Sequence, residues 1–528
     1  MTTRPWFNHY SSWVPQELPL PELSMIDLFE RTAAARPQAP AIHYFEESVG
    51  FGRLDDQANR FATWLARHGI AKGDRVAVVT QNDPEFAVAQ LGAWKRGAIL
   101  VPLNPMFKAK ELDYHLRDSG ARALVALASY REQHREVIAA APVECMLTTH
   151  TGGDFQAVLA AETPDPAARL TVGPEDIAQL VYTSGTTGPP KGAIGLHRNI
   201  ALNAEVFRQW MQIGEGDVIL GAAPLFHITG LVADLALSYL TGAPLVLYHR
   251  FEAAATLRMV ERWRATFCVA AITAYIALMN DPAAASADFS SMTKCYSGGA
   301  PVAPGIVDQF QAKLGVRIHN IYGLTESNSP SHATPLGAQG PVDPNSGALA
   351  IGLPIPNLDG RIVDLADPSR VLAPGEPGEL AMRGPMMFPG YWNKPEATTA
   401  AFHGDGWFLT GDVAVMDEQG WFYIVDRKKD MIVASGFKVW PRDVEDVLYQ
   451  HPAVRECAVI GVPDPYRGET VKAFVALKNG APVVTGEEIM TFCKERLAAY
   501  KYPRLVEFVP EIPKTATGKF LRRALRGG

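Results

Sequence analysis

The segment from Thr183 to Gly192 has the composition of a loop that holds a polyphosphate. It reads Thr-Ser-Gly-Thr-Thr-Gly-Pro-Pro-Lys-Gly and follows an apolar stretch typical of a buried strand. Glycines let backbone N–H groups point into a concavity, hydroxyls add donors, and Lys191 adds a full positive charge. It is not a Walker A loop, because Pro190 precedes the lysine and Gly192 stands where a serine or threonine is required. The alternative is an ordinary polar turn. The phosphate-binding candidates are Ser184, Gly185, Thr186, Thr187, Gly188 and Lys191.

Further motifs follow this loop in the chain, and their order is informative. They are Pro224–His227, Ser297–Pro301, Tyr322–Glu326, Gly406–Asp412, Asp426–Asp430 and Pro513–Lys519. With the loop, this set resembles the signatures of the AMP-forming acyl-adenylating enzymes, which include acyl-CoA synthetases, firefly luciferase and the adenylation domains of peptide synthetases. The resemblance spans nearly the whole chain.

The resemblance implies attack of a carboxylate on the α-phosphorus of ATP, with pyrophosphate leaving and the acyl group passing to a thiol. Because two anions must meet, the protein's task is alignment and charge neutralisation. No covalent nucleophile is needed, and the chain has no GxSxG nucleophile elbow. The implied cofactors are ATP, Mg²⁺ and CoA.

In such a site Glu326 supplies a carboxylate oxygen for Mg²⁺, together with the hydroxyl of Thr183. The family places Thr325 on the α-phosphate and the ring of Tyr322 against adenine. The other nucleotide-binding candidates that the resemblance implies are Gly299, Ala300, Pro301 and Gly323.

Asp412 is a carboxylate suited to the ribose hydroxyls, with Arg427 assisting; a lone Gly-Asp would otherwise be read as a β-turn. His227 follows an apolar stretch and by itself would be a packed core histidine. Adenylation domains that select α-amino acids usually carry an acidic residue there. The resemblance therefore implies a substrate without an amino group, with His227 in the wall beside the carboxylate and pantetheine rather than as a general base.

The resemblance also implies a C-terminal domain with two orientations. Lys519 would by itself be a solvated charge, but in the family this lysine reaches the carboxylate and α-phosphate. Lys429 stands at the family's hinge, and Gly436 would face the pantetheine tunnel in the second orientation. Lys514, Arg522 and Arg523 are expected to be solvated or to act as general electrostatic groups.

The acid is expected to be a medium- or long-chain fatty acid, because the segment 426–448 looks most like long-chain fatty acyl-CoA ligases. The alternatives are an aryl or other carboxylic acid:CoA ligase, or a free-standing enzyme that loads a carrier protein. A non-catalytic nucleotide sensor is disfavoured by the intact motifs. The apolar or small candidates for an acyl pocket are Ile228, Leu231, Ala270, Ala271, Ile272 and Gly298.

The elements that must position these residues can also be predicted. Apolar residues at helical spacing over 54–66 precede Gly69, a helix stop. A strand over 75–80 is followed by Asp83-Pro84, which predicts an N-cap and a first-turn proline. This strand–helix–strand pattern repeats along the chain and indicates parallel sheets covered by helices. Further strands are expected near 98–102, 178–183, 244–248 and 317–322.

After residue 360 helical periodicity disappears, and glycines separate short apolar runs as far as 425. This predicts a small antiparallel or barrel-like unit. The pattern from 427 onward predicts an α+β domain. Helices are expected after Pro441 and over 487–498, and strands near 457–462, 471–477 and 505–509. We therefore expect an α/β fold: a large N-terminal domain (1–426) of two αβ-layered subdomains plus the barrel-like unit, and a C-terminal α+β domain (427–528). The resemblance implies that this last domain is a mobile lid.

Composition excludes several other classes. The 528 residues are 47% hydrophobic and carry a net charge of −7, which argues against disorder and against nucleic acid as a partner. The five cysteines are widely spaced and predict neither a disulfide framework nor structural zinc. We expect a cytoplasmic protein with no signal peptide or transmembrane segment. Peripheral membrane contact and a homodimer are left open.

Overall fold

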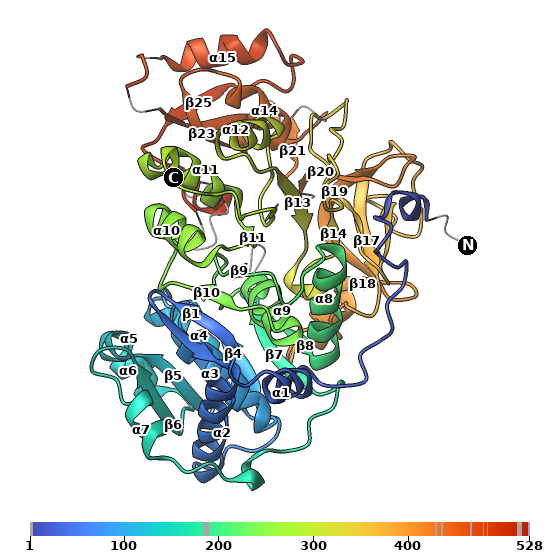
Figure 1. Ribbon diagram of the computed structural model, residues 1–528. Helices are drawn as coiled ribbons and strands as arrows, with labels where there is room; N and C mark the ends of the chain where they lie inside the picture. The colour runs from blue at the N-terminus through green and yellow to red at the C-terminus, as the bar shows by residue number, and fades with distance from the viewer. Residues whose placement is uncertain are drawn as a thin grey trace.

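The computed structural model describes residues 4–183, 189–427, 430–434, 437–464, 467–478, 480–482, 484–514 and 520–525. These residues form four β-sheets with helices packed between and around them, and Figure 1 shows the C-terminal sheet at one end of the molecule. The mixed α/β architecture confirms the predicted fold class.

The first sheet has six strands, in the spatial order β6 (Cys145–Thr149), β5 (Ala123–Leu127), β3 (Arg75–Val79), β4 (Ile99–Pro102), β7 (Ile177–Tyr182) and β8 (Gly192–Leu196). All neighbours are parallel except β7 and β8. The antiparallel β8 differs from the expected parallel pattern, because the connection after β7 is too short for a helical crossover. The predicted phosphate loop therefore begins at the carboxyl end of β7.

The second sheet has nine strands, in the order β15 (Leu353–Pro354), β14 (His332–Ala333), β13 (Ile318–Tyr322), β12 (Lys294–Ser297), β11 (Phe267–Ala270), β9 (Ile219–Leu220), β10 (Leu245–Leu247), β1 (Pro40–Tyr44) and β2 (Glu47–Gly50). Its central strands are parallel, and antiparallel strands flank them at both edges. Since β12 and β13 are parallel neighbours, the motifs that follow them lie at one edge of the sheet, where ligands bind in open α/β folds.

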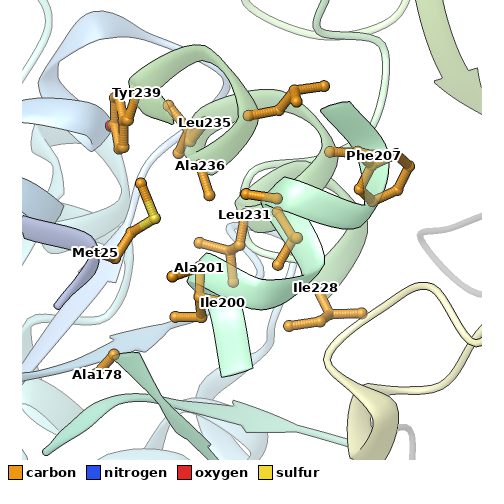
Figure 2. Packing of buried hydrophobic residues seen from close by; sticks show 14 of the residues in the cluster. Met25, Ala178, Ile200, Ala201, Phe207, Ile228, Leu231, Leu235, Ala236 and Tyr239 are labelled. Atoms are coloured by element: carbon orange, nitrogen blue, oxygen red, sulfur yellow. The ribbon is translucent and has the colours of Figure 1, made fainter. Parts of the chain in front are cut away.

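A layer of helices joins the two large sheets. It contains α1 (Met25–Ala35), α2 (Phe51–Arg67), α3 (Pro84–Lys95), α8 (His197–Trp210), the π-helix η3 (Gly230–Ala236) and α9 (Leu237–Thr241). One core cluster includes residues from this layer and from both sheets. Figure 2 shows Ile200 and Ala201 of α8 against Leu231 of η3, with Ala178 of β7 nearby. The predicted N-cap of α3 is confirmed, because the Asp83 carboxylate accepts the Phe86 N–H at 2.8 Å.

The outer helices cover the sheets and connect their strands. They are η1 (Pro5–His9), α4 (Ala109–Ser119), α5 (Ala128–Gln133), α6 (Arg135–Ala140), α7 (Phe155–Ala161), η2 (Pro166–Ala168), α10 (Ala253–Trp263), α11 (Ile272–Asn280), η4 (Pro282–Ala285), α12 (Pro304–Leu314) and η5 (Thr325–Ser327). Within the described residues, no helix combines the length and apolar character needed to cross a membrane.

The third sheet is antiparallel, as one of the two readings of this region predicted. It contains β16 (Asp359–Val363), β17 (Gly378–Arg383), β18 (Phe402–His403), β19 (Trp407–Met416) and β20 (Phe422–Arg427). A short helix, α13 (Pro395–Ala401), lies between β17 and β18, although helical periodicity disappears in this part of the sequence. None of its residues is buried, so it carries no apolar stripe for sequence periodicity to reveal.

The fourth sheet confirms the α+β pattern predicted for the C-terminal region. It contains β21 (Ile432–Ala434), β22 (Phe437–Val439), β23 (Val454–Asp464), β24 (Gly468–Leu477) and β25 (Leu505–Phe508), with α14 (Pro441–Tyr449), α15 (Gly486–Lys494) and α16 (Arg522–Leu525). Arg442 of α14 donates its backbone N–H to the Asp426 carboxylate at 3.0 Å and a side-chain N–H to the Ile424 carbonyl at 2.9 Å. These bonds join the region to β20.

Candidate active site

The mouth of the phosphate loop is closed by its own backbone and by a distant segment. The Thr183 N–H donates to the Lys191 carbonyl at 2.9 Å. Just beyond, the Trp392 N–H donates to the Gly192 carbonyl at 2.8 Å, and Ala193 pairs with Tyr391 in an antiparallel bridge. The loop residues Ser184 to Gly188 lie outside the described residues. The two ends that carry Thr183 and Lys191 are thus held together.

Lys191 and Glu326 both contact Tyr391. The Lys191 ammonium lies 4.2 Å from the centre of the Tyr391 ring. The hydroxyl of the same ring donates to Glu326 Oε1 at 2.7 Å. Burial, followed by the Glu326 charge, raises the pKa of Tyr391 well above its usual value, so the hydroxyl keeps its proton and remains a donor. One side chain, Tyr391, therefore contacts both the ammonium group predicted to bind phosphate and the carboxylate predicted to bind Mg²⁺.

Glu326 lies on a single turn, η5, whose backbone is held from outside. The Glu326 carbonyl accepts the Phe388 N–H at 2.8 Å. Asn203, fully buried on α8, donates its amide to the carbonyls of Ser327 at 2.8 Å and Asn328 at 2.9 Å. Asn328 has a positive φ of 52°, which asparagine tolerates better than most residues. Sequence analysis missed Asn203, because a lone asparagine within a helix gives no signal of its partner.

Tyr322 and Asp412 form a second link between sheets. The Tyr322 hydroxyl donates to Asp412 Oδ2 at 2.6 Å, and Asp412 is buried on β19. Asp412 pairs with Arg427 across β19 and β20, although the Arg427 side chain lies outside the described residues. His332 meets the Tyr322 ring edge-on at 5.9 Å, and burial lowers its pKa to about 3, so it is neutral near pH 7. The predicted adenine and ribose residues are therefore adjacent.

The glycines predicted to line the purine slot lie where the backbone approaches closely. A Cβ on Gly298 would come within 2.6 Å of the Ile321 carbonyl oxygen, and one on Gly323 within 3.1 Å of Pro330 Cα. Gly299 has a φ of +78°. Ala300 is half-buried and Pro301 is exposed. Together with Thr325, the first residue of η5, these residues lie at the carboxyl edge of the nine-stranded sheet.

His227 lies on a turn in front of η3. Its Nδ1 accepts the Thr229 N–H at 3.3 Å and lies 3.2 Å from Thr229 Oγ1. Asn82, at the carboxyl end of the other sheet, holds the preceding segment. It donates to the carbonyls of Gly221 and Ala223 and accepts the Leu225 N–H at 2.9 Å. Sequence analysis missed Asn82 too.

Several predicted residues lie outside the described residues, namely Lys429, Gly436 and Lys519. The base of the turn that carries Lys519 is described. Lys514 and Phe520 form an antiparallel bridge, and the Leu521 N–H donates to the Pro513 carbonyl at 2.7 Å.

Of the two roles expected for Arg522, a solvated group or a general electrostatic group, the structure favours the second. Its guanidinium donates to both Glu445 oxygens at 2.8 Å. It also lies 3.5 Å from Asp430. Both bonds come from Nη2, and the Arg522 side chain keeps 20% of its surface exposed.

Two protein-family models match this chain. A family model described as AMP-binding enzyme matches residues 29–392, and a model described as AMP-binding enzyme C-terminal domain matches residues 443–519. The chain belongs to the AMP-binding enzyme family.

This AMP-binding enzyme is similar to known proteins over nearly its full length. The chain is 37% identical to a long-chain-fatty-acid–CoA ligase of Bacillus subtilis, over 99% of this chain and 97% of the relative. It is 36% identical to a feruloyl-CoA synthase of Amycolatopsis sp., over 94% of this chain and 97% of the relative. The solved structure of ATP-bound MatB from Rhodopseudomonas palustris matches with a TM-score of 0.87 at 29% identity, covering 95% of this chain and 98% of MatB. Apo MatB, at 30% identity and the same coverage of both chains, matches with a TM-score of 0.76.

The donors present suit magnesium and a nucleotide. In the described part of the chain, no group of three or more histidine, cysteine, aspartate or glutamate side chains could hold a metal by itself. A single carboxylate such as Glu326 is sufficient as a protein ligand for magnesium, which proteins commonly bind through one or two carboxylates while phosphates supply further oxygens.

This AMP-binding enzyme also has a surface cavity of about 870 Å³ lined by Lys294 and Arg317. That cavity lies at the amino ends of β12 and β13, opposite the edge where the motifs converge.

Proposed function

We propose that this AMP-binding enzyme is an AMP-forming acyl-CoA ligase that activates a long-chain fatty acid with ATP and transfers the acyl group to CoA. The observation that carries the proposal is the convergence of Lys191 and Glu326 on Tyr391, beside the bonded pair of Tyr322 and Asp412. Full-length similarity to a fatty acid CoA ligase supports the choice of acid and acceptor.

The chain's residues would then act as follows. Lys191 and the loop of Ser184, Gly185, Thr186, Thr187 and Gly188 hold the phosphates, and Thr325 orients the α-phosphate. Glu326 and the Thr183 hydroxyl would hold Mg²⁺, which when bound neutralises charge on the phosphates. Lys519 would neutralise the charge that develops as the acid's carboxylate oxygen bonds to the α-phosphorus and the bond to pyrophosphate breaks.

Adenosine would lie between Tyr322 and the backbone of Gly299, Ala300, Pro301 and Gly323, with Asp412 and Arg427 on the ribose. His227 would line the wall between acid and pantetheine. Gly436 would face pantetheine after the domain from residue 427 turns about Lys429. These assignments are proposals for experiment.

A second candidate acid is an aryl carboxylic acid, because the similarity to feruloyl-CoA synthase is nearly as high as that to the fatty acid ligase. The fatty acid is favoured because the candidate pocket residues are apolar or small. Ile228 and Leu231 are buried beside α8 in Figure 2. A carrier-protein thiol is the alternative acceptor.

The decisive experiment supplies ATP, Mg²⁺ and CoA with straight-chain acids of four to eighteen carbons and with aromatic acids. We expect AMP, pyrophosphate and acyl-CoA as products, with the highest kcat/KM for long chains. Release of ADP would overturn the mechanism. Preference for an aromatic acid would select the second candidate, and activity only with a carrier protein would change the acceptor.

We also propose that the enzyme acts in the cytoplasm. All five cysteines are free thiols, as expected in a reducing compartment that supplies ATP and CoA. Fractionation of cells that express the native chain, followed by immunoblotting of the soluble and membrane fractions, tests this location.

A further inference from the structure

Tyr391 contacts both charged groups of the proposed phosphate site, although no predicted role includes it. Its hydroxyl donates to Glu326 Oε1 at 2.7 Å, and the Lys191 ammonium lies 4.2 Å from its ring centre. Within the described residues, Lys191 and Glu326 form no ion pair with each other. Tyr391 therefore gives each group a contact, a hydrogen bond for Glu326 and the ring face for Lys191, while the two groups do not pair directly with each other.

The two contacts reinforce each other. A phenol that donates its proton toward a carboxylate gains electron density on its ring, because hydrogen-bonded groups polarise one another. A more electron-rich ring attracts a cation over its face more strongly. Burial adds to this effect, because Tyr391 is only 7% exposed and water screens the contacts little.

The ring is fixed by its surroundings. The Tyr391 backbone pairs with Ala193 beside the phosphate loop, and its N–H donates to Thr398 Oγ1 at 2.9 Å. The Phe388 ring meets it edge-on at 4.8 Å. Gly390 has a φ of +150°, and a Cβ there would come within 2.6 Å of Thr398 Cγ2. A side chain held this firmly can impose its geometry on the flexible residues that it touches.

We propose that Tyr391 is a positioning residue that holds the Glu326 carboxylate and the Lys191 ammonium apart and aligned for Mg²⁺ and the phosphates of ATP. The role rests on the proposed function. It assigns separate tasks to the two parts of the side chain: the hydroxyl orients Glu326, and the ring face orients Lys191.

Two substitutions separate these tasks, with ATP binding measured by calorimetry in Mg²⁺ and in EDTA. Tyr391→Phe keeps the ring and removes the hydroxyl. We expect it to weaken ATP binding about tenfold in Mg²⁺, as loss of a hydrogen bond to a charged group does, and to leave binding in EDTA unchanged. Tyr391→Leu removes both contacts and should weaken binding in both conditions. Equal losses in both conditions for Tyr391→Phe, or no loss, would overturn the proposal.

Tyr423→Phe is the matched control. The Tyr423 hydroxyl also donates to a carboxylate, that of Asp417 at 2.7 Å, but it lies on β20 away from the loop. ATP binding should not change in this variant. Thioester formation from preformed acyl-AMP and CoA should also be normal in Tyr391→Phe, because that step uses neither Mg²⁺ nor the lost phosphates. A parallel loss in that step would indicate general distortion and overturn the role.

The wild-type enzyme distinguishes the two ways of failing. If it does not exchange pyrophosphate into ATP with any acid, the proposed function fails. If it does, and Tyr391→Phe binds ATP with the wild-type dependence on Mg²⁺, the role of Tyr391 alone fails.

Discussion

At the scale of single residues, the site depends on side chains that bond to one another across different sheets. Tyr322 ends a strand of the nine-stranded sheet, and Asp412 lies on the antiparallel sheet. Their 2.6 Å bond joins the proposed adenine and ribose contacts. A buried carboxylate with a phenol donor keeps a fixed orientation, which is what recognition of two neighbouring hydroxyls requires.

Asp412→Asn should weaken ATP binding without unfolding the protein. The amide keeps the shape of the carboxylate but accepts weaker hydrogen bonds, and a bond to a charged group contributes about 1.5–3 kcal/mol. We expect the KM for ATP to rise by roughly one to two orders of magnitude. Steady-state kinetics with varied ATP measure it. An unchanged KM would remove Asp412 from the nucleotide site.

At the scale of elements, helices and loops hold the catalytic turns by bonds to their backbones. α8 reaches the turn of Glu326 through Asn203, and the carboxyl end of β3 reaches the turn of His227 through Asn82. These bonds join groups 124 and 143 residues apart in the chain. A rigid layer of helices can therefore fix turns that have little structure of their own.

Asn203→Ala should destabilise the protein and disturb the Glu326 turn. It leaves the Ser327 and Asn328 carbonyls without the Asn203 amide, which should lower the free energy of unfolding by about 1–3 kcal/mol. Denaturant unfolding measures this loss, and a higher Mg²⁺ requirement is expected with it. Asn59→Ala, which removes an amide that contacts Asp55 within the same helix, is the control. Equal effects of both variants would contradict the role of Asn203.

The loop after β6 contains a pH-dependent contact. His150 Nε2 lies 2.8 Å from the buried Asp83 carboxylate, which raises the pKa of His150. Burial raises the pKa of Asp83, and Glu85 and His249 are the other titratable neighbours. Protonated His150 therefore stabilises the fold fully below its unfolded pKa of about 6.5, and this contribution is lost as the pH rises through its higher folded pKa.

His150→Asn should therefore flatten the dependence of stability on pH. Asparagine tolerates the positive φ of 66° at this position. We expect a loss on the order of 1 kcal/mol at pH 6 and almost none at pH 9. Urea unfolding at the two pH values measures it. If the free energy of unfolding changed with pH equally in the wild type and in His150→Asn, His150 would be excluded as the source of the pH dependence.

At the scale of the whole molecule, the proposed two-step reaction requires two positions of the C-terminal region. The match to ATP-bound MatB is closer than that to apo MatB. Arg442 joins α14 to β20, and Arg522 joins α16 to α14.

Lys519→Ala should slow adenylation by two to three orders of magnitude, as loss of a comparable electrostatic stabiliser does. Transfer from preformed acyl-AMP to CoA should be largely spared, because the proposed change of orientation would carry this lysine away before the thiol attacks. The two half-reactions are measured separately. Loss of neither would remove Lys519 from the active site, and loss of both would contradict the rearrangement.

Lys429→Pro should produce the opposite pattern. Proline restricts the backbone at the proposed hinge, so the change of orientation should slow while the adenylating arrangement persists. Thioester formation should fall more than pyrophosphate exchange. Equal losses in the two half-reactions would place the hinge elsewhere.

The sequence by itself determined the family, the order of the motifs and some of the local boundaries. Asp83-Pro84 predicted the start of α3 because an N-cap bonds within its own turn, and Gly69 followed α2 with a φ of +74° because only local sterics matter there. Such signals involve neighbours a few residues apart. The same is true of the phosphate loop and the other motifs, whose chemistry is carried by short runs of residues.

Only the tertiary structure decided which distant side chains meet. Tyr391 lies 65 residues from Glu326, and Arg522 lies 77 residues from Glu445. Neither pairing leaves a periodic trace in the chain, so sequence patterns predict neither the contacts of Tyr391 nor the carboxylate that Arg522 pairs with. These contacts arise when sheets and helices pack, because a buried polar group must find a partner wherever the fold places one.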